Sequence, residues 1–157
     1  MKKLDQCELL CGESGGSLVE MALLLPVFVV LLLGAVDFGR AFYLANELAG
    51  AARAGATYGS RNPTDTLGMA TVAVDDAADV PGASAGTPTY QCECANGSNL
   101  ISGSACAVAP PTCTGGLNWV YKVTVTVTGT YTPLLPWPGI PSPMNLSTTA
   151  SMRSAGS

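Results

Sequence analysis

The first pattern along the chain is an apolar run from Leu18 to Val36 that contains a single charged residue, Glu20. Its length is close to the ~20 residues that an α-helix needs to cross a bilayer. Pro26 is compatible with such a helix, because proline is tolerated near the start of a span. The alternative is a secretory signal peptide, which has a shorter apolar core of about 7–15 residues close behind a basic start. We therefore predict a transmembrane helix over residues 16–38.

The residues after this span predict that the helix continues over residues 39–61, until Asn62-Pro63 ends it. Small residues recur there at four-residue spacing, which lets helix backbones approach each other closely. Two partners fit such a face: other helices in a membrane, or the protein's own outer domain. The small residues are Ala41, Ala45 and Ala49, followed by Ala51, Gly55 and Gly59.

Two later segments, residues 119–131 and 144–153, alternate strictly between apolar and polar side chains. Strict alternation indicates a half-buried β-strand, with one face on a core and the other towards water. A short helix over residues 64–80 and a cysteine-rich loop over residues 82–118 precede the strands. We expect the strands to pair as an antiparallel hairpin that packs on the long helix. The prediction is an α+β fold with a small outer domain over residues 62–157.

The cysteine-rich loop contains Cys92, Cys94, Cys106 and Cys113. Their spacing lacks the paired Cys-x₂-Cys pattern that is typical of zinc ribbons, so a zinc site is the less favoured interpretation. An even number of cysteines in a loop-rich region predicts disulfides, formed in an oxidising compartment. Two pairings fit: Cys92–Cys106 with Cys94–Cys113, or Cys92–Cys113 with Cys94–Cys106. The N-terminus is therefore expected in the cytoplasm and the outer domain in the periplasm or outside the cell.

The charge composition excludes several functions. Charged residues make up 11% of the chain, the net charge is −4 and there is no histidine. Without histidine, Ser-His and Cys-His catalytic dyads are impossible, and without a basic patch nucleic-acid binding has no support. The aspartates within residues 75–79 fit solvated carboxylates. We expect a non-enzymatic protein with no cofactor, no metal site, no nucleic-acid partner and no small-molecule substrate.

The junction before the apolar run has the order of residues that a prepilin peptidase needs. Gly15 and Gly16 mark the predicted processing site, which makes residues 1–15 a cytoplasmic leader. Glu20 then stands in the first turns of the span, where a carboxylate in hydrocarbon costs roughly 3 kcal/mol and usually has a functional partner. The new amine of a neighbouring subunit's Gly16 is the natural candidate, so Glu20 is the predicted assembly residue.

Three stretches of the N-terminal region together resemble the TadE-like family, which contains small pseudopilins and related anchored proteins encoded with tight-adherence (Tad, Flp-type) pili. They are Gly16 to Pro26, Gly34 to Tyr43 and Ala51 to Tyr58. The resemblance implies a type IV pilin-like fold and a single-pass inner-membrane protein that acts as a pseudopilin or minor pilin. The partners it implies are the membrane, a prepilin peptidase, other pilins or pseudopilins and the pilus assembly platform. A permanently anchored assembly factor or surface protein is the alternative.

Asp37, Phe38, Gly39 and Arg40 lie where the predicted span leaves the bilayer. Asp37 and Arg40 are one helical turn apart, and an exposed ion pair at that spacing contributes only a few tenths of a kcal/mol. The family resemblance implies a role in setting membrane depth or docking the outer domain. The alternative interpretation is that both are interfacial charges at the membrane edge.

Overall fold

The computed structural model describes residues 14–155, so most of the leader predicted over residues 1–15 lies outside the described part of the chain. The chain divides into two compact units, residues 1–39 and residues 40–157. Helix α1, Ser14–Arg61, contributes residues to both units. The predicted α+β class, a long apolar N-terminal helix with a small antiparallel sheet and two disulfides, is confirmed.

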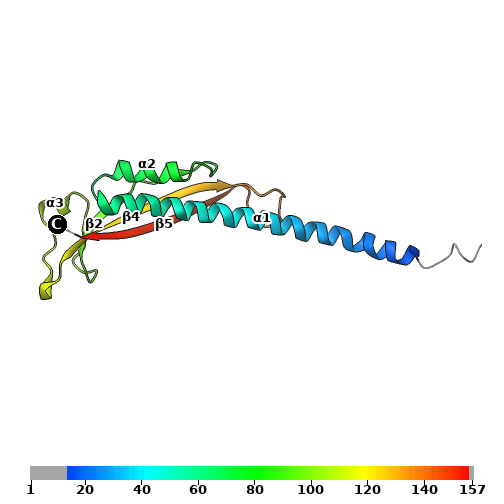
Figure 1. Ribbon diagram of the computed structural model, residues 1–157, viewed down its shortest axis with the longest axis horizontal. Helices are drawn as coiled ribbons and strands as arrows, with labels where there is room; N and C mark the ends of the chain where they lie inside the picture. Colours follow the sequence, from blue (N-terminus) through cyan, green and yellow to red (C-terminus); the bar gives the residue numbers. More distant parts are fainter. Residues whose placement is uncertain (1–13, 156–157) are drawn as a thin grey trace, which may run out of the picture. The chain divides into compact units, whose positions relative to one another are not determined.

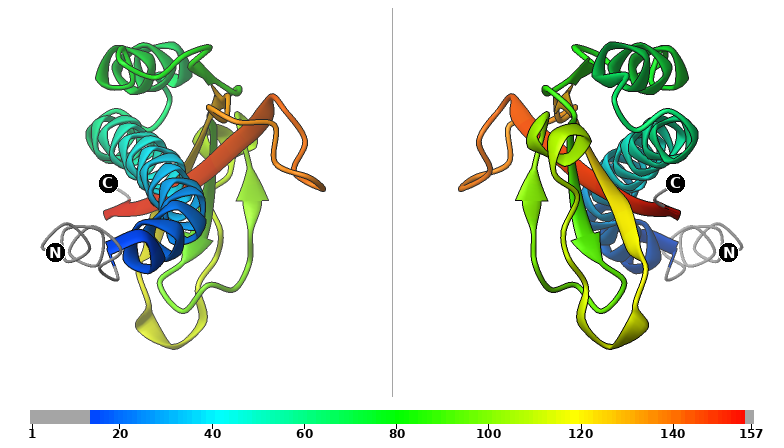
Figure 2. Two further views of the ribbon diagram at one scale, coloured as in Figure 1. Left: turned by 90° about the vertical axis from the view of Figure 1, so that its right-hand side faces the viewer. Right: turned by 90° about the vertical axis from the view of Figure 1, so that its left-hand side faces the viewer.

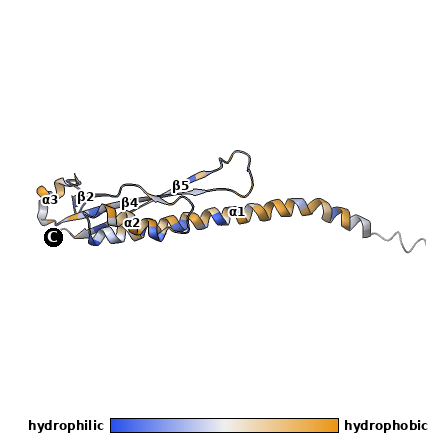
Figure 3. Ribbon diagram, turned by 90° about the horizontal axis from the view of Figure 1, so that it is seen from above, coloured by the Kyte–Doolittle hydropathy of each residue, from blue (hydrophilic) through white to orange (hydrophobic). Residues whose placement is uncertain are grey.

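The described part of the first unit is the N-terminal half of α1, and its apolar side chains are almost all exposed. In Figure 3, the ribbon of this half of the helix has mostly the colours of hydrophobic residues. The helix is long and apolar enough to cross a membrane, and none of its most apolar window is buried inside the protein. A soluble protein's core helix would be mostly buried. This half of α1 is therefore a candidate membrane span.

The second unit contains an antiparallel sheet built around β4, Trp119–Tyr131 (Figure 2). One edge of β4 pairs along its length with β5, Met144–Ala155. The other edge is shared by two strands, β2, Thr89–Cys94, and the short β1, Ser84–Ala85. The remaining strand, β3, Ile101–Ser102, pairs with the outer edge of β2 and does not pair with β4. The two predicted strands therefore form the predicted hairpin, but they belong to a five-stranded sheet.

The core of the second unit lies between one face of this sheet and two helices. Side chains of β4 alternate as predicted, and Val123, Val125 and Val127 are fully buried. They pack against the C-terminal half of α1 and against α2, Thr66–Asp76 (Figure 1). Asp65 caps α2 by accepting a hydrogen bond from the Gly68 amide at 2.9 Å. The helical residues of this core are Leu48, Ala51, Ala52 and Ala56 from α1, and Met69 and Ala73 from α2.

The small residues near the end of α1 are packed inside the second unit. A Cβ atom added to Gly55 would lie 2.8 Å from the Met69 carbonyl oxygen, 2.9 Å from the Ala73 Cβ and 3.2 Å from the Val125 Cγ1. Only a glycine allows α1 to approach α2 and β4 this closely. Of the two partners proposed for this face, the protein's own domain is the one observed for Ala51, Gly55 and Gly59.

Two predicted boundaries differ from the structure. The segment predicted as a loop over residues 82–118 contains β2, because its residues pair along the free edge of β4, a distant contact that local composition does not reveal. The helix predicted over residues 64–80 ends at Asp76, and two tight turns follow it. In these turns the Ala77 amide bonds to the Val74 carbonyl, and the Val80 amide bonds to the Ala77 carbonyl. These bonds span three residues, too few to continue an α-helix.

We expect Gly55→Ala to destabilise the second unit, with Gly50→Ala as its matched control. Both substitutions gain up to ~1 kcal/mol of helix propensity. At Gly50 the new methyl group would lie 3.7 Å from its nearest neighbour, an ordinary contact. At Gly55 the crowding costs about 1–3 kcal/mol. The thermal midpoint of the full-length protein should rise for Gly50→Ala and stand clearly lower for Gly55→Ala. Equal midpoints would contradict the close packing.

Candidate functional site

The predicted processing site, Gly15 and Gly16, lies in the first turn of α1. Both residues are exposed, and a Cβ atom on either would meet no other atom within 4 Å. Glycine costs about 1 kcal/mol relative to alanine in a helix. Packing within the described residues therefore gives no reason for either glycine, and the local propensity opposes both.

Glu20 follows one turn further along the same helix and is exposed among apolar side chains. It is the only charged residue from Gly15 to Val36. The structure gives it no ion pair within residues 14–155. An isolated carboxylate at this place is a strong hydrogen-bond acceptor and a charge that a lipid environment does not solvate. If the helix lies in a membrane, residues 14–155 of the same chain supply no counter-ion for Glu20.

The four predicted membrane-edge residues do not share one environment. Asp37 is only 4% exposed, whereas Phe38 is 75% exposed. Arg40 is also exposed, and both Asp37 and Arg40 take part in intramolecular interactions. At Gly39 a Cβ atom would meet nothing within 4 Å. Both interpretations of this segment, a role in setting depth or docking the outer domain and interfacial charges at the membrane edge, therefore stay predictions.

The cysteines form the first of the two predicted pairings, Cys92–Cys106 and Cys94–Cys113. The Cα atoms are 5.7 Å apart in the first pair and 5.6 Å apart in the second. Cys92 and Cys94 are two positions apart on β2, so both point to the same face of the strand. Each bridge contributes about 2–4 kcal/mol in the chain-entropy estimate. Together they hold the segment between β2 and β4 against the sheet.

Sequence reasoning missed a buried acid between these two cysteines. The side chain of Glu93 is only 2% exposed, and its Oε1 lies 2.6 Å from the Nη2 of Arg153 on β5. Arg153 is 53% exposed and reaches Glu93 across the face of β4. The Oε1 atom has no hydrogen bond of good geometry, so the attraction is mainly between charges. The signal in the sequence was the position of Glu93 between two cysteines.

A second polar contact fixes the start of α2. The Tyr58 hydroxyl of α1 donates to a carboxylate oxygen of Asp65 at 2.7 Å, while the other oxygen accepts from the Gly68 amide. The Tyr58 hydrogen bond, and then the Gly68 amide, lower the pKa of Asp65 below its usual range. The same hydrogen bond raises the pKa of Tyr58. The lowered pKa favours the charged carboxylate of Asp65 and the raised pKa favours the protonated hydroxyl of Tyr58, so both groups keep the forms that this hydrogen bond needs at neutral pH.

A family model described as TadE-like protein matches residues 15–57. The match covers the glycine pair, Glu20, the membrane-edge segment and most of α1, and it confirms the resemblance predicted for this region. The sheet, the disulfides and α2 lie outside it. No curated protein and no solved structure matches the chain significantly.

We expect Arg153→Met to destabilise the protein, because it leaves a buried carboxylate without its counter-ion. The cost should be about 1–3 kcal/mol, reduced by the water that already screens the half-exposed arginine. Lys122→Met is the matched control, since Lys122 lies opposite Arg153 in the sheet and makes no ion pair among residues 14–155. Chemical unfolding of the full-length protein measures both.

The double variant Glu93→Gln with Arg153→Met should recover part of the lost stability, because a neutral amide is cheaper to bury than a charge. A Lys122→Met variant as unstable as Arg153→Met would mean that any lost cation on this face has the same effect, and that the ion pair is unimportant.

Proposed function

Taking the TadE-like N-terminal region as the premise, we propose that this protein is a pseudopilin or minor pilin of a Tad-type adhesive pilus. In this role it is a non-enzymatic structural or assembly component, processed by a prepilin peptidase. One observation carries the proposal: two glycines that the fold does not need stand in the first turn of an exposed apolar helix, and the single glutamate that follows them has no ion pair among residues 14–155. The TadE-like match over residues 15–57 supports it.

The proposed topology places the leader in the cytoplasm, α1 residues 16–38 in the inner membrane and the second unit on the outer side. The two disulfides of the second unit support this orientation, because disulfides form and persist in oxidising compartments. The exposed apolar side chains of α1 support the membrane location. Lipid would cover them before assembly, and the helices of neighbouring subunits would cover them in a fibre.

Cleavage after Gly15 would give Gly16 a new amine, and that amine is charged in part of the molecules at neutral pH, since its pKa is about 8. In a fibre this amine of one subunit would approach Glu20 of its neighbour. Pairing the two groups would compensate two opposite charges that are otherwise isolated in apolar surroundings. Such a contact sets the axial position of one subunit against the next, because the amine and the carboxylate lie at fixed places on their helices.

A permanently anchored assembly factor or surface protein is the second candidate, and one observation favours it. Helix α1 begins at Ser14, so the bond between Gly15 and Gly16 lies within the first helical turn. A peptidase could reach this bond only after the turn unwinds. Helix ends fray readily, so this requirement slows cutting without preventing it.

We expect Gly15→Arg to block processing, because a large charged side chain would crowd the peptidase site next to the cut. Gly39→Arg is the matched control: it places the same side chain at an equally open glycine of the same helix. Intact mass and N-terminal sequencing of protein from the native membrane distinguish the outcomes. The unaltered protein and the control should begin at Gly16, and Gly15→Arg at Met1. An unaltered protein that begins at Met1 would favour the permanent anchor.

We expect Glu20→Ala to remain inserted and processed but to enter fibres poorly. Loss of the intersubunit pair should lower its share in sheared fibres by roughly tenfold or more, since 1.4 kcal/mol corresponds to a factor of ten. Glu47→Ala, which alters the same residue type further along α1, should be incorporated normally. Normal incorporation of Glu20→Ala would contradict the pairing with the amine, whatever the result for the leader.

A further inference from the structure

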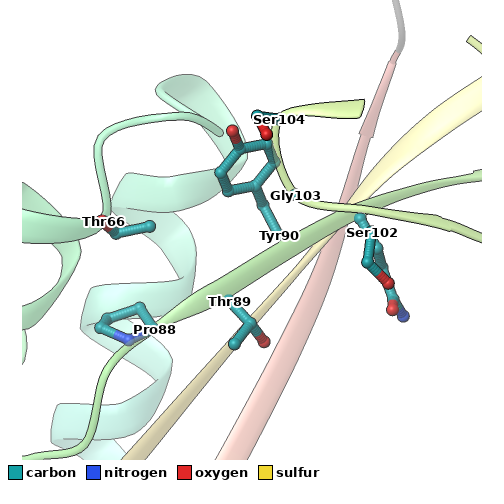
Figure 4. Close-up of a pocket in the computed structure, with 8 residues that line it drawn as sticks. Thr66, Pro88, Thr89, Tyr90, Ser102, Gly103 and Ser104 are labelled. Atoms are coloured by element: carbon teal, nitrogen blue, oxygen red, sulfur yellow. The ribbon is translucent and has the colours of Figure 1, made fainter. Parts of the chain in front are cut away.

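A cleft of about 560 Å³ opens on the second unit, far along the chain from the glycine pair and Glu20 (Figure 4). It lies where the beginning of α2, the strand β2 and the turn from β3 to α3, Ala105–Val108, come together. Its volume falls in the range of about 300–1,000 Å³ that is usual for small-molecule sites. The residues that line it are Thr66, Pro88, Thr89, Tyr90, Gln91, Ser102, Gly103 and Ser104.

The lining is polar but carries no formal charge. Six of its side chains are hydroxyls or an amide, and the structure gives none of these six a side-chain hydrogen bond within residues 14–155. Ser104 stands at the N-cap position of α3 without making a capping bond. Hydroxyls elsewhere on the sheet pair with each other, as Thr126 does with Thr149 at 2.8 Å. The cleft therefore offers a group of neutral donors and acceptors that the fold does not use.

The lining side chains divide into an inner set and a rim. In the view of Figure 4, the Tyr90 ring extends towards the turn that carries Ser104, and Thr66 lies at the start of α2; all three line the cleft. Thr89 and Gln91 alternate with Tyr90 along β2 and so point to the other side of the strand. The half-buried Tyr90 also packs edge to face with Tyr121, with ring centroids 6.5 Å apart. An aromatic ring surrounded by hydroxyls thus forms the inner set.

Both walls of the cleft are fixed before any ligand arrives. On one side, the Cys92–Cys106 disulfide ties β2 to α3, and the Gly103 amide donates to the Tyr90 carbonyl at 2.9 Å. On the other side, Asp65 holds the turn before Thr66 through its bonds to Tyr58 and Gly68. The cleft therefore needs little ordering of its side chains or backbone when a ligand binds. Preorganisation of this kind favours binding, because it lowers the entropy cost.

We infer that this cleft binds a neutral, hydroxyl-rich ligand, a mono- or disaccharide built from pyranose rings. A pyranose carries hydroxyl groups around an apolar C–H face, which matches an aromatic ring bordered by hydroxyls, with further polar groups on the rim. Ions lack a charged partner in the lining, and a peptide lacks the apolar side-chain pocket that usually anchors it. The inference does not depend on the fate of the leader.

The test is saturation-transfer NMR on the full-length protein in lipid nanodiscs, which avoids the sugar headgroups of alkyl-glycoside detergents. The probes are maltose, cellobiose, lactose and N,N′-diacetylchitobiose. We expect saturation transfer to at least one of them. Tyr90→Phe and Ser104→Ala should each weaken its affinity by roughly 2- to 10-fold, the loss expected for one neutral hydrogen bond. Tyr90→Phe keeps the ring and its packing, so it tests binding without disturbing the fold.

Matched controls are Tyr43→Phe and Ser147→Ala, which make the same changes at exposed positions outside the cleft and should leave affinity unchanged. Three results would overturn the inference: no transfer to any of the four sugars, unchanged affinity in both cleft variants, or binding of N-acetylneuraminic acid or triglycine in place of the neutral sugars. None of these results bears on the pilin-like role, which rests on the other end of the chain.

Discussion

The second unit depends on how closely α1 can approach the elements packed on it. Gly55 has a backbone oxygen, a methyl group and a valine side chain close to the place where its own side chain would be. Gly59 is similarly crowded by Met69, and Gly129 on β4 by Val80 and Leu48. At these three glycines, neighbouring atoms fill the space that a side chain would need, from both backbone and side chains at Gly55 and from side chains alone at Gly59 and Gly129. With no large aromatic residue at the centre, the alanine-rich core is thin, and thin cores tolerate little change in spacing.

Local patterns predicted the parts of this fold that local physics controls. Alternation located β4 and β5 and named their buried faces, because a half-buried strand repeats every two residues. The apolar run located the exposed half of α1. By contrast, β2 is a strand because it forms hydrogen bonds with the edge of β4. The sequence of residues 89–94 alone does not predict this pairing.

The same distinction applies to the candidate sites. The glycine pair and Glu20 are adjacent in sequence and could be read directly. The cleft gathers side chains from residues 66, 88–91 and 102–104, and Glu93 meets Arg153 from the far end of the chain. Both arrangements depend on pairing in the sheet. The sequence analysis assigned Glu93 no role, because its partner Arg153 is 60 positions away in the chain.

Two glutamates of this protein occupy opposite electrostatic situations. Glu93 is buried and has its counter-ion, Arg153, in the same chain, so this ion pair forms when the domain folds. Glu20 is exposed on an apolar helix and has no ion pair in the described residues. The carboxylate of Glu93 is paired within its own molecule, whereas the carboxylate of Glu20 can still accept a counter-ion from another molecule. In the proposed pilin-like role, Glu93 would serve folding and Glu20 would serve assembly.

The link between β2 and β4 is far longer than the hairpin requires. Cys94 and Trp119 are directly opposite each other in the sheet, and the Ala95 amide bonds to the Asn118 carbonyl at 3.0 Å. A turn of two to five residues, the usual length for a hairpin, would close this pair. Residues 95–118 are therefore an insertion into a complete hairpin, held by its own two bridges. Because the alanine and valine core lies elsewhere, this insertion can vary in sequence between related proteins while the scaffold beneath it stays the same.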